Sequence, residues 1–108
     1  MKRGTIVWVN LEGASPPEFG KVRPGLVVSN TVQNGILDSV VVVPLSTRPG
    51  EIWPLRLRVG LPGGKESFAV LPGIRQVSKK RLMDEVGLAS ADVLGKLDDA
   101  LRAYLTGD

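Results

Sequence analysis

Short apolar runs separated by turn residues dominate the first four fifths of the chain. Residues 5–11 and 67–71 are rich in β-branched and aromatic side chains and predict strands. Residues 39–45 are apolar on both faces, which predicts a central, fully buried strand that ends at Pro44. Residues 53–59 alternate, so Trp, Leu, Leu and Val share one face while Pro and two Arg share the other.

Weaker signals fill the gaps between these runs. Residues 25–29 predict a second strand, and residues 74–77 a short strand or bend. The segment 12–22 is rich in Gly, Pro and Ser and predicts a loop that is long for so small a domain. Asn34-Gly35 and the segment 46–51 carry turn signals. Five or six short strands at this spacing indicate a small barrel or sandwich.

The C-terminal segment has a different periodicity. Ser90 can cap a helix, and Asp92 in the first turn favours the helix dipole. Apolar residues then recur at three- and four-residue spacing: Val93, Leu94, Leu97, Ala100, Leu101, Tyr104 and Leu105. This pattern predicts one amphipathic helix, about residues 91–105, packed on the barrel.

Composition narrows the chemistry. The 108 residues suit a single domain, residues 1–108, and contain no cysteine, hence no disulfide or thiolate metal site. The absence of histidine removes the usual general acid–base near neutral pH. We expect no cofactor and no metal. No apolar run reaches membrane-spanning length and the start lacks a signal-peptide pattern, so we expect a cytoplasmic protein.

Charge is unevenly spread along the chain. Residues 1–81 contain 12 Lys/Arg and 5 Asp/Glu, a net charge of +7, whereas residues 82–108 contain 2 and 6, a net charge of −4. A basic body with an acidic C-terminal segment is compatible with a polyanionic ligand. On charge alone, a solvated surface with chance asymmetry is slightly favoured.

Four features are candidates for chemistry, and each has a simpler structural explanation. The first pairs Arg23 with Glu18, which as a surface ion pair would be worth little. The second is Ser46-Thr47, whose hydroxyls can also satisfy turn amides. The others are strand and surface cations, for which solvation alone is the simpler explanation: Arg75, the Arg56/Arg58 face, Arg48, and the basic run Lys79, Lys80 and Arg81.

Taken together, these features favour a phosphate ligand. Arginine offers forked donors and a hydroxyl can orient a non-bridging phosphate oxygen. Without histidine, the plausible reaction is RNA cleavage in which the RNA's own 2′-hydroxyl is the nucleophile. The protein would then stabilise the charge of the phosphorane and position the leaving group.

At this point the chain resembles the MazF/PemK family of toxin endoribonucleases. Four blocks carry the resemblance, in the family's order and spacing: "RGTIVWVNL" (3–11), "KVRPGLVVSN" (21–30), "VVVVPLST" (40–47) and "VLPGIRQVSKKRL" (70–82). The resemblance implies a mainly β, SH3-like barrel of five to seven strands with a C-terminal helix. It also implies a homodimer and a cognate antitoxin that occupies the RNA site.

The resemblance implies an activity and a site. The activity is metal-independent, sequence-selective cleavage of single-stranded RNA, leaving a 2′,3′-cyclic phosphate and a 5′-hydroxyl. The family's catalytic arginine falls on Arg23, its catalytic threonine on Ser46 with Thr47 directly after, and its loop glutamate on Glu18. We expect the RNA to be bound by Arg75, Arg56, Arg58, Phe19, Arg48 and Lys79.

The chain departs from the family motifs at three positions. Phe19 and Gly73 stand where the family often has glutamine, and Ser78 stands where it often has aspartate. These departures remove groups that could position RNA, so they bear on sequence specificity more than on turnover. Phe19 offers instead an aromatic face on which a base can stack.

Two other functions remain open. One is a non-catalytic toxin on the same barrel that grips a protein, as the gyrase-poisoning toxins do, and needs no hydroxyl–arginine site. The other is a decayed homologue that only binds RNA or its antitoxin. RNA cleavage that depends on Arg23 separates the enzyme from both.

Overall fold

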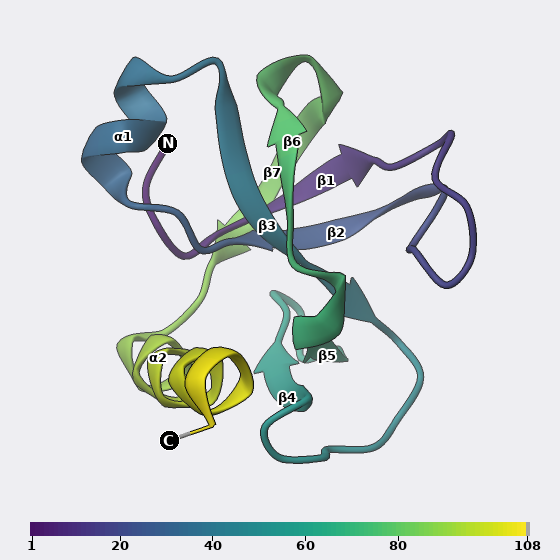
Figure 1. The fold of residues 1–108 in the computed structure, drawn as a ribbon, viewed down its shortest axis with the longest axis vertical. Coiled ribbons are helices and arrows are strands. Elements are labelled where there is room, and N and C mark those ends of the chain that lie inside the picture. Colours follow the sequence, from purple (N-terminus) through teal and green to yellow (C-terminus); the bar gives the residue numbers. More distant parts are fainter. Residues whose placement is uncertain (108) are drawn as a thin grey trace.

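Seven antiparallel strands and one long helix make up the computed structural model, which describes residues 1–107 (Figure 1). The strands are β1 (Thr5–Asn10), β2 (Val22–Val27), β3 (Ser39–Ser46), β4 (Arg56–Gly60), β5 (Glu66–Val70), β6 (Arg75–Ser78) and β7 (Leu82–Leu88). Their order in the sheet is β4-β5-β3-β2-β1-β7, with β6 also paired to β3. This architecture confirms the expected β-rich fold with a C-terminal helix.

Two apolar clusters hold the fold together. One lies among β1, β2, β3 and β6 and consists of Val7, Val9, Leu11, Val27, Val40, Val42 and Val77. The other joins these strands to β4, β5 and α2 (Ala91–Thr106), and includes Ile6, Leu26, Leu57 and Leu97. Figure 1 shows α2 beside β4, on the side opposite β5. No helix within residues 1–107 is long and apolar enough to cross a membrane.

The helix α2 matches its prediction within one residue. The Ser90 side chain accepts a hydrogen bond from the Val93 amide, and Gly107 ends the helix in a left-handed conformation. Arg3 fastens this helix to the barrel, because its guanidinium donates to the Val28 carbonyl at 2.8 Å and pairs with Asp98 at 2.6 Å. The spacing of apolar residues predicts this helix correctly because one face of the helix is buried.

The predicted second strand, residues 25–29, was placed too late. The strand begins at Val22, so Arg23 and Pro24 lie inside it. β2 pairs with β1 across its first five residues but with β3 only from Gly25 onward. The start of β2 is therefore a sheet edge on the β3 side, where a proline is tolerated.

Pro44 does not end β3, which continues to Ser46. β3 changes partner at this point: it pairs with β6 as far as Val42 and with β5 from Leu45. Pro44 thus sits in the gap between two partners on that side, where a missing amide donor costs little. The predicted central and buried position of this strand is confirmed.

The turn predicted at Asn34-Gly35 was wrong, because the segment forms the short helix α1 (Thr31–Ile36). Asn30 caps the helix by accepting from the amides of Val32 and Gln33. Asn34 is buried, and its side-chain amide donates to the carbonyls of Met1 and Ser29. A tertiary contact of the asparagine therefore outweighs its local preference for a turn.

Strand β4 is shorter than the alternating run 53–59. Leu57 and Val59 are buried as expected, but Trp53 and Leu55 are exposed. The chain turns at Ile52, whose carbonyl accepts from the amides of Leu55 and Arg56. β7 was not predicted, since its sequence does not alternate and its pairing with β1 is irregular.

Candidate functional site

Strand register directs Arg23, Ser46 and Arg75 to one face of the sheet. Gly25 of β2 pairs with Pro44 of β3. Arg23 lies two residues before Gly25, and Ser46 lies two residues after Pro44. Because side chains alternate along a strand, Arg23 and Ser46 leave their strands on the same side. Arg75 of β6 pairs with Val42 of β3 and shares that side.

Arg23 is held in place by the loop that precedes β2. Its Nε donates to the Gly20 carbonyl at 3.2 Å, and its guanidinium carbon lies 4.5 Å from the centre of the Phe19 ring. The side chain is partly buried. Its two terminal nitrogens have no hydrogen-bond partner among residues 1–107, so forked donors remain available to a ligand.

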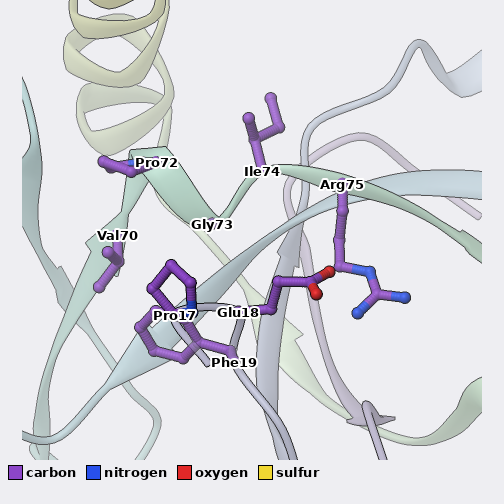
Figure 2. A pocket seen from close by; sticks show the side chains of 8 residues that line it. All are labelled: Pro17, Glu18, Phe19, Val70, Pro72, Gly73, Ile74 and Arg75. Atoms are coloured by element: carbon purple, nitrogen blue, oxygen red, sulfur yellow. The ribbon is translucent and has the colours of Figure 1, made fainter. Parts of the chain in front are cut away.

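A pocket of about 470 Å³ lies beside this loop (Figure 2). Most of its wall is apolar, and its lining residues are Pro17, Glu18, Phe19, Val70, Pro72, Gly73, Ile74 and Arg75. Figure 2 shows the Phe19 ring beneath Gly73 and the Glu18 carboxylate extending toward Arg75. One terminal nitrogen of Arg75, Nη1, is buried and lacks a hydrogen-bond partner within residues 1–107.

Glu18 links this pocket to Arg23. It also lines a second pocket, of about 430 Å³, formed by the loop 12–21 and Arg23. Its side chain is exposed. The structure thus brings Glu18, Phe19, Arg23 and Arg75 to one region.

The hydroxyl of Ser46 stabilises the turn after β3 and can still donate a hydrogen bond. Its oxygen accepts a hydrogen bond from the Arg48 amide at 3.1 Å, which is the simpler role considered for it above. The hydroxyl proton is still free to donate to a phosphate oxygen. Thr47 and Arg48 follow on the exposed loop after β3.

Arg56 and Arg58 extend this face across two further strands. Ser46 pairs with Phe68 of β5, and Phe68 pairs with Arg58 of β4. Arg58 is exposed and lies 3.5 Å from Glu66. Arg56 is already engaged, since it donates to the carbonyls of Arg48 and Gly50. Its guanidinium carbon also lies 5.7 Å from the centre of the Phe68 ring. Arg56 therefore holds the loop after β3, and Arg58 is more available to a ligand.

The basic run at residues 79–81 divides into different roles. Arg81 donates from Nη1 to the carbonyls of Asn10 at 3.0 Å and Glu12 at 3.1 Å, and so fixes the start of the long loop. Sequence reasoning missed this role because the two acceptors lie 71 and 69 residues away. Lys79 lies beside Asp38 and does not line the pocket.

The arrangement offers cationic and hydroxyl donors and the carboxylate of Glu18, with Glu12 also on the second pocket, and no imidazole. Forked guanidinium donors and a hydroxyl suit an oxyanion such as a phosphoryl group. Among residues 1–107, no three acidic side chains gather in a way that could hold a metal ion. The site can therefore stabilise developing negative charge next to a pocket wide enough for a planar group.

Comparison with known proteins shows the family of the chain. Residues 2–105 match the family described as "PemK-like, MazF-like toxin of type II toxin-antitoxin system". The chain is 29% identical to endoribonuclease MazF9 of Mycobacterium tuberculosis, over 97% of this chain and 96% of that protein.

Two solved structures share the fold. A MazF from Deinococcus radiodurans has a TM-score of 0.84 and 24% identity, over 97% of this chain and 96% of the other. An endoribonuclease in complex with its cognate antitoxin, from a mycobacterial species, has a TM-score of 0.80 and 25% identity, over 97% of this chain and 94% of the other.

Proposed function

Because the chain belongs to the PemK-like, MazF-like toxins of type II toxin–antitoxin systems, we propose that its 108 residues form one toxin domain that cleaves single-stranded RNA. The name of its mycobacterial relative, endoribonuclease MazF9, supports this activity. The observation that carries the proposal is the placement of Arg23 and Ser46 on one sheet face, with free donors beside the pocket.

The proposed reaction is a transesterification within the RNA. The 2′-oxygen attacks the adjacent phosphorus as it loses its proton, and the bond from phosphorus to the 5′-oxygen breaks. The 5′-oxygen leaves with a proton, which gives a 2′,3′-cyclic phosphate and a 5′-hydroxyl. The sequence of events needs no metal ion.

Each site residue has a role in this reaction. Arg23 stabilises the charge of the phosphorane and assists proton transfer to the leaving oxygen, since a guanidinium keeps its proton and is a poor base. Ser46, together with Thr47, holds the scissile phosphate. Glu18, the carboxylate that lines both pockets, accepts the proton of the 2′-hydroxyl.

The basic sheet face gives the RNA a path. Arg75 at the pocket, Arg48 on the loop and Arg58 on β4 offer donors for phosphates, and Arg56 supports this surface from beneath. Phosphate contacts of this kind position a chain without reading its bases. Base selectivity would come from the pocket, whose lining is mainly apolar.

The proposal is tested with purified protein and a long single-stranded RNA in the presence of EDTA. We expect cleavage at a limited set of sites, with every new 3′ end carrying a cyclic phosphate and every new 5′ end a hydroxyl. A matched double-stranded RNA should resist cleavage. Cleavage that disappears with EDTA, or product ends with a 5′-phosphate, would contradict the mechanism.

Absence of any cleavage would favour a binding function instead. In that case the two alternatives are distinguished by what the protein retains. Capture of gyrase would indicate a gyrase-poisoning toxin, whereas binding of RNA or antitoxin alone would indicate a decayed homologue.

We also propose that the toxin is a homodimer regulated by a cognate antitoxin and acts in the cytoplasm, where its RNA substrate is found. The mycobacterial relative solved with its antitoxin supports the partner.

Around α1, Val32, Ile36 and Leu37 stay exposed, and a symmetric dimer would cover such apolar surface. Sedimentation at micromolar concentration should show two copies, alone and with the antitoxin encoded beside the gene. A monomer in both samples would contradict the dimer.

A further inference from the structure

Phe19, in the loop 12–21, contacts the guanidinium of Arg23 and also lines the pocket beside Gly73. Its ring lies under the guanidinium of Arg23, at 4.5 Å from ring centre to guanidinium carbon. The same ring forms part of the pocket wall beneath Gly73 (Figure 2). The Nε of Arg23 is fixed at the same time by the Gly20 carbonyl, the residue next to Phe19. Two contacts from adjacent residues therefore define where the guanidinium lies.

Gly73 makes room for this ring. A Cβ atom added at residue 73 would lie 3.3 Å from Cδ1 of Phe19 and 2.5 Å from Cγ of Pro44. The proline ring is fixed in β3, so it has little freedom to give way. A larger side chain at residue 73 must therefore displace itself or press on Phe19.

We propose that Phe19 is a positioning residue for Arg23, and that Gly73 is required for Phe19 to hold that place. This inference rests on the proposed role of Arg23 in RNA cleavage. It also changes the interpretation of Phe19, because one ring face that could stack a base already carries the guanidinium. The two residues are coupled in space, because a Cβ at residue 73 would lie 3.3 Å from the Phe19 ring.

The physical benefit is an ordered guanidinium before the substrate arrives. A free arginine side chain has many rotamers, and ordering it during the reaction opposes catalysis. Stacking on an aromatic ring and one hydrogen bond remove most of that freedom in advance. Loss of the ring should therefore lower the rate of the chemical step more than it lowers RNA affinity.

The test compares Phe19→Leu, which keeps an apolar side chain, with Phe19→Tyr, which keeps the ring. We expect Phe19→Leu to lower kcat about five- to thirtyfold, the range that a cation–π contact supports. Affinity for an RNA with a 2′-deoxy substitution at the mapped cleavage site should stay within about twofold. Phe19→Tyr should keep kcat near the wild-type value. An equal loss of affinity and rate would show that Phe19 stacks a base and would overturn the inference.

A second measurement does not depend on catalysis. In an NMR spectrum, the Nε proton of Arg23, assigned with Arg23→Lys, should be shifted upfield by the Phe19 ring. The shift should persist in Phe19→Tyr and vanish in Phe19→Leu. If the wild type does not cut RNA, the proposed function fails, yet this shift still decides whether Phe19 holds Arg23. An unchanged shift and unchanged kcat in Phe19→Leu would overturn the positioning role alone.

Gly73 is tested with a matched glycine. Gly73→Ala should lower kcat and move the Arg23 resonance, because the new methyl group meets Phe19 and Pro44. Gly60→Ala serves as the control, since a Cβ at Gly60 meets nothing within 4 Å. Equal behaviour of the two variants would remove Gly73 from the proposal.

Discussion

Replacing Arg23 with alanine is expected to slow RNA cleavage about 10²–10³-fold, the usual cost of removing a donor to a developing oxyanion. The reason lies in the geometry of its three nitrogens. Only Nε is used within residues 1–107, by the Gly20 carbonyl, and both terminal nitrogens remain for a phosphate. Arg23 also lines the second pocket with Glu18 and stacks on Phe19, which places it beside the carboxylate proposed to accept the 2′-hydroxyl proton.

Lysine at residue 23 should recover only part of this loss. It keeps the positive charge but presents a point charge in place of two forked donors, and it stacks less well on Phe19. Rates are best measured in single turnover with saturating enzyme, which isolates the chemical step from product release. We expect the order wild type, Arg23→Lys, Arg23→Ala.

Arg102→Ala is the matched control for this series. Arg102 is also an arginine, but it is exposed on α2 and lies 3.9 Å from Asp99. Its loss should leave the cleavage rate within about twofold, because an exposed pair of this kind contributes little. If Arg23→Ala also cuts RNA at the wild-type rate, the assignment of Arg23 is wrong.

The sequence predicted the elements whose side chains are buried in a regular period. The run of apolar residues in β3 and the three- and four-residue spacing in α2 both reflect burial, and both elements lie where expected. The predictions that failed concern segments whose local structure depends on contacts that the local pattern does not show. Asn34 forms a helix instead of a turn because its amide reaches Met1, 33 residues away. Trp53 is exposed because a turn at Ile52 ends the alternation.

The site residues named from the sequence stay predictions, and their contacts could not be predicted from it. Strand ends and motif order suggested Arg23, Ser46 and Arg75, and strand register directs these three side chains to one face. The stacking of Arg23 on Phe19 could not be read from the sequence, since it depends on the bend of the loop and on the empty space at Gly73. The same holds for Arg81, whose acceptors lie at the far end of the chain's first strand.

Gly4→Ala is expected to destabilise the fold by about 2–4 kcal/mol, because two costs meet at this residue. Gly4 has φ of +95°, which an alanine adopts only with strain. A Cβ would also lie 2.9 Å from Cδ1 of Leu94, which packs into the cluster joining α2 to the strands. The backbone cannot move away easily, since the Gly4 amide donates to Val27 at 2.7 Å and its carbonyl accepts from Ala89 at 2.8 Å. Urea unfolding at one fixed protomer concentration measures the change.

Gly13→Ala separates the two costs. Gly13 has nearly the same φ, +94°, but a Cβ there meets nothing within 4 Å. It should therefore show the backbone strain alone, about 1 kcal/mol or slightly more. The difference between the two variants is then the contact with Leu94, which is the end of a flexible side chain and can relieve part of the clash by rotating. Equal destabilisation by both variants would mean that Leu94 yields completely and that α2 is not held by close packing at Gly4. Because Gly4 lines neither pocket, Gly4→Ala should still cleave RNA at the wild-type rate wherever it remains folded. Stability would then depend on Gly4, before β1, and catalysis on Gly73, before β6.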